Sequence, residues 1–161
     1  MRAKATQLKA EEGIEWLAVD YLQFMVPSSQ KGYSKEQEIS AISRGLKRLA
    51  KELDIPVIAL AQLSRDVEKR GGAKRPQLSN LRDSGAIEQD ADLIIFPYRP
   101  EYYKILHDEQ GNSTADITEL IIAKHRNGNT AEVAVRSEMK FGRYEDLQVE
   151  CLPKFFHHPP L

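Results

Sequence analysis

The sequence predicts an α/β fold with a mostly parallel sheet flanked by helices and a C-terminal β-hairpin. Three observations lead to this class. Apolar runs at residues 15–20 and 57–61 have the length of buried strands. Between them, residues 34–53 carry an apolar stripe with helical spacing, so the order strand, helix, strand predicts a right-handed parallel crossover. Farther on, the Asn127-Gly128 pair between apolar segments is typical of a hairpin.

The first elements are predicted from residue composition and from the positions of glycine and proline. Residues 2–12 are rich in Ala, Lys, Glu and Gln, which predicts a helix, and Gly13 is a typical residue to end it. Residues 15–20 form the first strand. Residues 26–33 contain Pro, Gly and two serines, so we expect a loop there.

The central helix has the clearest signal. Ser34 is a helix-capping residue, and Gln37 completes a capping box with it. The next strand, 57–61, ends in Gln62. Because parallel strands end at one edge of a sheet, we expect Gln62 to share the carboxyl edge with Asp20. The apolar residues of the helix, spaced alternately three and four apart, are Ile39, Ile42, Leu46, Leu49 and Leu53.

The second half of the chain predicts shorter elements. We expect residues 1–147 to form one partial domain and residues 148–161 to form a loosely packed C-terminal tail. Within the domain, the expected elements are a short helix at about 80–89, a strand at 93–96, a surface loop at 100–115, a strand at 117–123, a return strand with Val133 and Val135, and a short strand at 141–144.

Length and composition limit the class of protein. A chain of 161 residues is long enough for one domain with a real core. No apolar stretch reaches the length of a membrane span and no secretory signal is present, so we expect a cytoplasmic protein with no membrane partner. The single cysteine, Cys151, excludes an internal disulfide framework. The histidines and this cysteine show no metal-ligand spacing.

Asp20 is the first candidate site residue. An aspartate at the carboxyl end of a buried strand lies where open α/β sheets bind ligands, and nucleotide-hydrolysing folds hold Mg²⁺ there. Residues 15–20 by themselves are equally consistent with a core strand followed by a turn that has no functional role. The phosphate-binding motif G-x-x-x-x-G-K-[S/T] is absent from the sequence. We therefore expect the second half of a nucleotide-binding domain without the first.

Two further positions complete a candidate nucleotide site. Gln62 is either a turn residue or a sensor of a terminal phosphate. Lys124 and Arg126 are two apart, so on an extended strand both side chains leave from one face near the hairpin tip. There an arginine can reach a neighbouring subunit's nucleotide, although a solvated hairpin is the alternative. An NTPase motor needs an acid for the metal, a phosphate sensor and such an arginine.

A basic segment follows Gln62. From Arg65 to Arg82 there are six basic and two acidic residues, together with Gly71-Gly72. This composition predicts a loop that contacts phosphates, to which Lys69, Arg70, Lys74 and Arg75 contribute weakly. A solvated surface loop is the alternative.

These residues carry a resemblance to a known family. The sequence is similar to the C-terminal half of the helicase domain of bacterial replicative DNA helicases, the DnaB family, over about residues 1–147. The stretch at 81–92 is highly specific. The matching motifs, in the family's order and spacing, are AVDYLQ at 18–23, SRGLKRLAKEL at 43–53, AQLSR at 61–65, KRP at 74–76, LRDSGAIEQDAD at 81–92 and KHRNG at 124–128.

The resemblance implies a RecA-like fold of which residues 1–147 supply the Walker B half and lack the Walker A half. It implies a replicative helicase that uses ATP and Mg²⁺ to move along single-stranded DNA as a homohexameric ring and so unwinds duplex DNA. The implied partners are single-stranded DNA, the other subunits, primase and a helicase loader. The isolated chain is expected to be inactive.

The resemblance also implies nucleotide-site roles. Asp20 matches the Walker B aspartate, which holds Mg²⁺ through water. Gln62 matches the glutamine that couples the state of the γ-phosphate to the DNA-binding loop. Arg126 matches the arginine finger given to the adjacent subunit's nucleotide, and Lys124 matches its companion.

A second set of matches concerns DNA. Arg82, Asp83 and Gly85 match the loop in the central channel that holds the DNA backbone. The family usually has Glu where Asp83 stands, so this side chain is shorter than the family's by one methylene.

Two other functions stay open. A non-catalytic DnaB-like module that binds DNA or a partner is supported by the missing P-loop motif. A RecA-like recombination or repair ATPase is disfavoured by the Lys124-x-Arg126 pair and by the motif at 81–92.

Overall fold

A computed structural model of the chain describes residues 1–25, 34–64, 67 and 74–147. The chain divides into two compact units. Unit 1 comprises Met1–Val67 and Gln77–Asp92, and unit 2 comprises Glu68–Pro76 and Leu93–Leu161. The loop predicted at 26–33 and the tail predicted at 148–161 lie outside the described residues.

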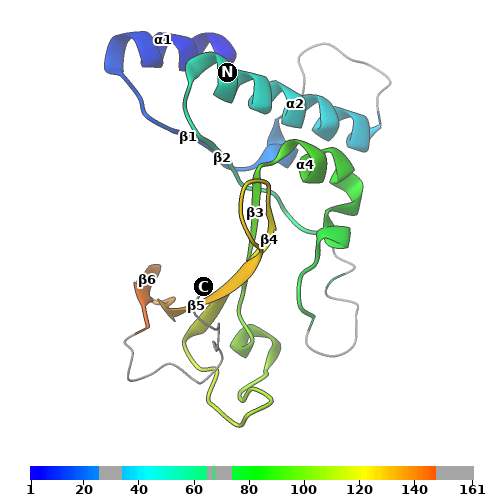
Figure 1. Ribbon diagram of the computed structural model, residues 1–161, viewed down its shortest axis with the longest axis vertical. Coiled ribbons are helices and arrows are strands. Elements are labelled where there is room, and N and C mark those ends of the chain that lie inside the picture. Colours follow the sequence, from blue (N-terminus) through cyan, green and yellow to red (C-terminus); the bar gives the residue numbers. More distant parts are fainter. Residues whose placement is uncertain (26–33, 65–66, 68–73, 148–161) are drawn as a thin grey trace. The chain divides into compact units, whose positions relative to one another are not determined.

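Unit 1 is built on a two-stranded parallel sheet. Strand β1 (Leu17–Val19) pairs in parallel with β2 (Val57–Ala59). Helix α2 (Lys35–Leu53) connects the two strands and passes alongside them (Figure 1). The predicted order of strand, helix and parallel strand is therefore confirmed. The buried core of this unit joins β1, the turn that follows it and α2, through Val19, Leu22, Ile42 and Leu46. Leu17, Met25, Val57, Ala61 and Ile87 are partly buried and pack against these residues.

Helix α2 begins and ends where its sequence predicts. The Gln37 N–H donates to Ser34 Oγ over 3.3 Å, and the Ser34 N–H donates to Gln37 Oε1 over 3.0 Å, which confirms the capping box. Of its apolar stripe, four residues are buried and Leu53 is partly exposed. Helix α1 (Arg2–Glu12) ends at Gly13 with φ of 65°, a left-handed conformation that favours glycine.

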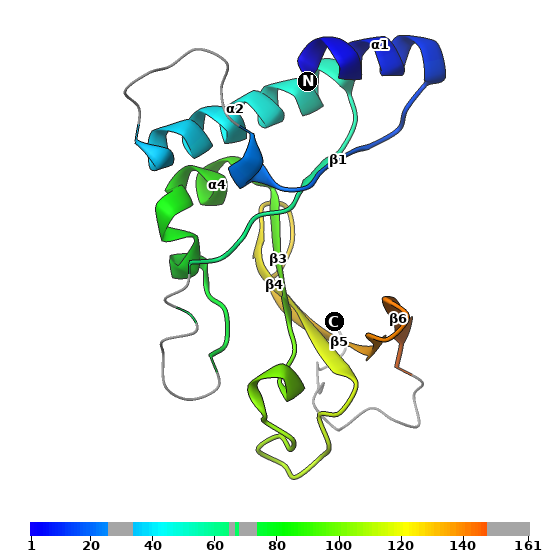
Figure 2. The same ribbon diagram turned by 180° about the vertical axis from the view of Figure 1, so that it is seen from behind.

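The helix expected at about 80–89 is two elements. A 3₁₀ helix, η2 (Leu78–Ser84), leads into α4 (Gly85–Asp90), with a kink at Leu81, whose ψ is 19°. Helix α4 lies beside α2, as the view from behind shows (Figure 2). A shorter 3₁₀ turn, η1 (Leu22–Phe24), follows β1.

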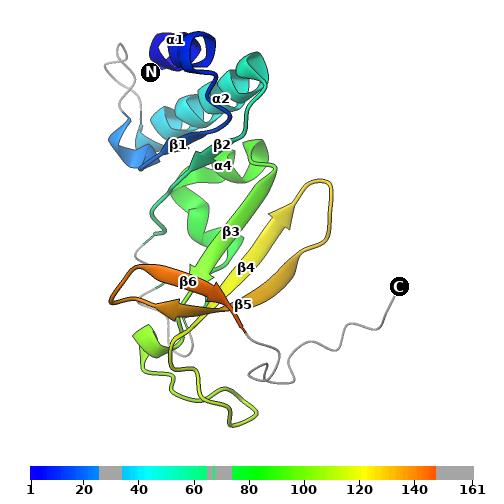
Figure 3. The same ribbon diagram turned by 90° about the vertical axis from the view of Figure 1, so that its left-hand side faces the viewer.

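Unit 2 is a four-stranded antiparallel sheet in the order β3-β4-β5-β6 (Figure 3). Each strand pairs with the next in sequence, because the intervening connections contain no long helix that would carry a parallel crossover. The strands are β3 (Leu93–Tyr98), β4 (Ile117–His125), β5 (Ala131–Glu138) and β6 (Arg143–Asp146), and a 3₁₀ turn, η3 (Glu101–Tyr103), follows β3.

The α/β class is confirmed. Among the described strands, parallel pairing is confined to β1 and β2, so this part of the chain contains fewer parallel pairs than the sequence predicts. The last strand, β6, begins two residues later than expected. In the part of the chain that the structure describes, no helix is both long and apolar enough to cross a membrane.

The predicted hairpin joins β4 to β5. Strand pairing stops at Ile122 opposite Ala131, and neither Asn127 nor Gly128 has a positive φ. The connection is therefore a longer loop and not the two-residue turn that Asn-Gly favours. A Cβ on Gly128 would lie 2.4 Å from Cε1 of His125, so the glycine makes room for that imidazole ring.

Candidate functional site

The carboxyl ends of β1 and β2 lie together. Past Val19, the ladder continues, because the Leu60 N–H donates to Val19 O and the Leu22 N–H donates to Leu60 O, each over 2.9 Å. Asp20, directly after β1, is exposed, and its peptide bond to Tyr21 is cis. The prediction that both strands end at one edge is thus confirmed.

Gln23 fixes the backbone of Gln62. Its side-chain Nε2 donates to Gln62 O over 3.1 Å, and its Oε1 accepts from the Gln62 N–H over 3.3 Å. A side-chain amide carries a donor and an acceptor like a peptide group, so Gln23 continues the strand pairing by one step. The Gln62 side chain is left exposed. The role of Gln23 was missed by the sequence reasoning; its only signal is an amide side chain three residues after Asp20.

The surroundings of Asp20 fit one kind of metal site. Among the described residues, no group of three or more His, Cys, Asp or Glu side chains is placed to hold a metal ion. Mg²⁺ in nucleotide sites is typically held by one or two carboxylates, with waters and substrate phosphates as the other ligands. A single exposed carboxylate at a strand end suits that arrangement, in which Asp20 bonds to metal-coordinated water.

Asn80 links the exit of β2 to η2. It is only 3% exposed. The Ser64 N–H donates to Asn80 O over 3.1 Å, and the Gln77 N–H donates to Asn80 Oδ1 over 2.7 Å. Two residues after Gln62, the chain is therefore tied to η2, which carries the predicted DNA-binding residues Arg82 and Asp83. Asn80 was not predicted as a site residue, although Gln77 and Asn80 have capping-box spacing.

The predicted DNA residues lie in η2 and at the start of α4. The backbones of Arg82 and Asp83 belong to η2, and their side chains are outside the described part. Gly85 is exposed, has φ of −51°, and has no atom within 4 Å of an added Cβ. The local fold therefore does not require glycine here.

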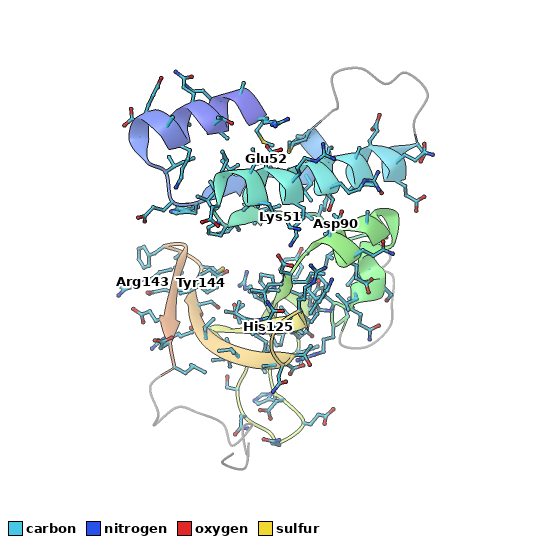
Figure 4. All side chains as sticks on the ribbon, turned by 45° about the horizontal axis from the view of Figure 1, so that its top comes forward. Lys51, Glu52, Asp90, His125, Arg143 and Tyr144 are labelled. Carbon is cyan, nitrogen blue, oxygen red and sulfur yellow. The ribbon has the colours of Figure 1, made fainter. Side chains whose placement is uncertain are left out.

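Lys124 and Arg126 belong to unit 2. Lys124 is half-buried near the end of β4, and Arg126 is exposed in the turn after it. His125, which is labelled in Figure 4, ends the strand between them. The prediction that both basic side chains leave from one face of a strand does not apply, because Arg126 lies one residue beyond β4.

Arg75 is held by acidic partners. Its Nη1 lies 2.5 Å from Glu119 Oε2, and its Nη2 lies 2.5 Å from Glu132 Oε2. Burial lowers the pKa of Arg75, but the hydrogen bond to Glu132 and the charges of both glutamates outweigh it, so the pKa lies above its usual value. In this structure Arg75 makes two ion pairs, and its weak contact with DNA stays a prediction. Lys69 and Arg70 lie outside the described residues.

The candidate residues thus fall in both units. The family model described as "DnaB-like helicase C terminal domain" matches residues 1–146, which include every one of them. The chain belongs to this family. All of the candidate DnaB motifs noted in the sequence lie inside the match.

Individual DnaB relatives are similar over most of this chain. The replicative DNA helicase DnaB of Geobacillus stearothermophilus is 44% identical over 148 residues, which cover 92% of this chain and 31% of the relative. The replicative DNA helicase DnaC of Bacillus subtilis (strain 168) is 43% identical with the same coverage. The chain therefore spans about a third of the length of these relatives.

Solved DnaB-type structures have the same fold. One, described as an ATPase domain, is 41% identical with a TM-score of 0.79, and the match covers 91% of this chain and 50% of that one. Another, described as a DnaB-like replicative helicase and its interactions with primase, is 41% identical with a TM-score of 0.78, covering 91% and 34%. These matches confirm the RecA-like fold class.

Proposed function

We propose that this DnaB-type chain is part of the ATP-dependent motor of a replicative DNA helicase in the bacterial cytoplasm. In this function a homohexameric ring moves along single-stranded DNA and unwinds the duplex. The observation that carries the proposal is the paired ends of β1 and β2, which bring Asp20 and Gln62 to one sheet edge in a chain of this family.

Asp20 and Gln62 serve the nucleotide. The Asp20 carboxylate would hold a nucleotide-bound Mg²⁺ through its water ligands, and the metal would supply neutralisation of phosphate charge. The Gln62 side chain donates to the terminal phosphate. Because Gln23 fixes the Gln62 backbone, a change at the phosphate is felt first by the side chain and by the residues that follow. The hydrogen bond from the Ser64 N–H to Asn80 O transmits this conformational change to η2.

The segment after that relay binds DNA. Arg82 supplies positive charge for the phosphates, Gly85 allows a close backbone approach, and Asp83 lies between them in the same DNA-binding segment. Contacts to phosphates carry no base information, so binding is independent of sequence and weakens with salt. One subunit offers few contacts, and a ring multiplies them.

The hairpin serves the neighbouring subunit. Arg126 stabilises charge that develops on the adjacent nucleotide during hydrolysis, and Lys124 assists it. The exposed position of Arg126 in the turn after β4 supports this role. Primase and a helicase loader are further partners, supported for primase by the solved relative whose description names it.

A chimeric helicase tests the proposal. Residues 1–146 of this chain replace the matching region of the Geobacillus stearothermophilus DnaB, and ATP hydrolysis and unwinding of a forked duplex are measured. We expect both activities, and we expect Asp20→Asn to remove most hydrolysis because a neutral amide holds metal-bound water less well. Glu15→Gln, an exposed carboxylate just before β1, is the matched control and keeps activity.

The other two functions give different outcomes. A hexameric chimera that binds DNA but hydrolyses no ATP would identify a non-catalytic module. A chimera that hydrolyses ATP on DNA but never unwinds the fork would favour a recombination or repair ATPase.

A further inference from the structure

Arg75 joins both strands of the hairpin that ends in Arg126. Glu119 lies near the start of β4 and Glu132 near the start of β5. In the strand register, Glu119 lies opposite Ala134 and Glu132 opposite Ile121, so the glutamates are diagonal neighbours on one face of the sheet. Without a cation, two carboxylates at such a spacing repel each other. Arg75 bridges them with separate nitrogens of one planar guanidinium.

The site is adapted to an arginine. Glu119 Oε2 is buried, so its ion pair with Arg75 compensates a charge withdrawn from water. The guanidinium carbon lies 5.3 Å from the centre of the Tyr98 ring, and Tyr98 lies opposite Glu119 on β3. Arg75 thus contacts three successive strands. A lysine has one charged nitrogen and cannot reproduce this geometry.

The residue before Arg75 has an unusual backbone conformation that the same cluster of side chains stabilises. Lys74 has φ of 49°, a left-handed conformation that residues other than glycine, asparagine and aspartate seldom adopt. Its Nζ lies 5.7 Å from the centre of the Tyr103 ring, which stacks on Tyr98. Such a conformation persists where surrounding contacts hold it, and here the side chains of two successive residues provide them.

We propose that Arg75 is a positioning residue that clamps the β4–β5 hairpin and anchors to it the segment leading into η2. From Arg75, the chain passes through Pro76 directly to Gln77 and the start of η2. The hairpin that presents Arg126 and the segment that precedes Arg82 therefore share one anchor. For its effect on catalysis this assignment rests on the proposed function; the clamp itself does not.

Hydrogen exchange on the 161-residue chain tests the clamp. In Arg75→Ala and in Arg75→Lys, the amides of β4 and β5 should exchange roughly 5- to 30-fold faster, while the amides of α2 keep their wild-type protection. Arg136→Ala removes an exposed arginine from β5 and is the matched control, with no change expected. Adding Glu132→Gln to Arg75→Ala should slow exchange part of the way back towards wild type, since it removes the repulsion between the two carboxylates that Arg75 no longer bridges.

Two results would overturn the clamp. One is wild-type exchange of the hairpin amides in Arg75→Ala. The other is wild-type exchange in Arg75→Lys, which would show that a positive charge alone suffices and that the two-point geometry is irrelevant.

The chimeric helicase separates positioning from DNA contact. With Arg75→Lys we expect the stimulation of ATP hydrolysis by single-stranded DNA to fall several-fold, with the KM for ATP and the affinity for single-stranded DNA unchanged. A phosphate contact would give the opposite pattern under Arg75→Ala, namely lower DNA affinity at unchanged maximal stimulation. If the unmodified chimera lacks ATP hydrolysis, the proposed function fails, whereas the exchange result on the clamp still stands.

Discussion

Arg126 lies in the turn after β4, exposed and beyond the last strand residue, which is a suitable place for a group offered to another subunit. In the chimeric helicase, Arg126→Ala should lower ATP hydrolysis by roughly 10³- to 10⁵-fold, the range found for arginine fingers in GTPases. Nucleotide binding should persist, because the finger acts on charge that develops in the transition state. Steady-state turnover and nucleotide titration measure the two effects.

Mixed rings tell which subunit the finger serves. When Arg126→Ala subunits are mixed with unmodified ones, activity should fall more steeply than the mutant fraction. A loss that follows the fraction in strict proportion would mean that Arg126 acts within its own subunit.

Asp108 gives a pH prediction in unit 2. Burial raises the pKa of its carboxyl, but hydrogen bonds from Asn112, Gln110 and Gly111 favour the charged form and outweigh burial, so the pKa lies below its usual 3.8. A lowered folded pKa means that the loop's stabilisation is complete above the unfolded pKa and is lost as the pH falls through the folded one. Amide NMR signals of Gln110 and Asn112 should therefore shift with a midpoint below 3.8.

The Asp108→Asn variant checks that assignment. Its amides should show no transition in this range, since the titrating group is gone. A midpoint at or above the usual value in the unmodified chain would contradict the hydrogen-bonding explanation.

At the residue scale, the sequence could reveal strand-end residues but not their local supports. Asp20 and Gln62 were predicted because an apolar run that ends in a polar residue can be recognised in the sequence alone. Gln23 and Asn80 work through hydrogen bonds to backbone atoms 39 and 16 residues away in the chain (62 − 23 and 80 − 64). No local pattern encodes such partners. The acidic partners of Arg75 were missed for the same reason, because these glutamates lie on strands far along the chain.

Element η2 depends on the box that begins it. Asn80→Ala removes the acceptor of the Gln77 N–H and should lower the free energy of unfolding by about 1–2 kcal/mol, as the loss of other capping residues does. Asn80→Asp keeps an acceptor oxygen and should therefore retain most of the free energy of unfolding that Asn80→Ala loses. Urea denaturation provides the measurement, with the exposed neighbour Ser79→Ala as control. Equal losses in Asn80→Ala and Asn80→Asp would show that the side-chain oxygen is not what stabilises η2.

Gly85, at the start of α4, allows a test of whether a glycine is needed for stability or for DNA binding. Because an added Cβ at Gly85 meets nothing within 4 Å, Gly85→Ala should leave stability unchanged or raise it by up to about 1 kcal/mol through helix propensity. In the chimeric ring the same variant should weaken binding of single-stranded DNA, as Arg82→Ala should. Thermal unfolding and DNA titration at two salt concentrations test both parts, and unaltered DNA affinity would remove Gly85 from the proposed interface.

At the element scale, the sequence pattern predicted which segments are helices and strands better than it predicted which strands pair with one another. The capping box and apolar stripe of α2 are confirmed because both signals are local. Strand β3 reads as apolar throughout, which predicts burial on both faces, yet its residues alternate between exposed and buried. Leu93 and Ile95 are 46% and 44% exposed. The pattern identified the strand correctly, but it could not say that its neighbour would be antiparallel.

For the whole molecule, the first expectation is inactivity. The 161-residue chain carries no G-x-x-x-x-G-K-[S/T] motif, so it has no P-loop to hold the phosphates. The purified chain should hydrolyse ATP no faster than buffer. Turnover that disappears with Asp20→Ala in the same preparation would show that this chain assembles a phosphate site by other means.

Trp16, the residue just before β1, can report optically on one exposed surface of the protein. It is the chain's single tryptophan and is 58% exposed. Nearby on β2 and its extension, Ile58 and Leu60 are 54% and 52% exposed. The intrinsic fluorescence of the protein therefore comes from one known place. An emission maximum typical of water-exposed indole in the free chain, moving to shorter wavelength when any polypeptide covers that end of the sheet, would follow assembly in real time without a label.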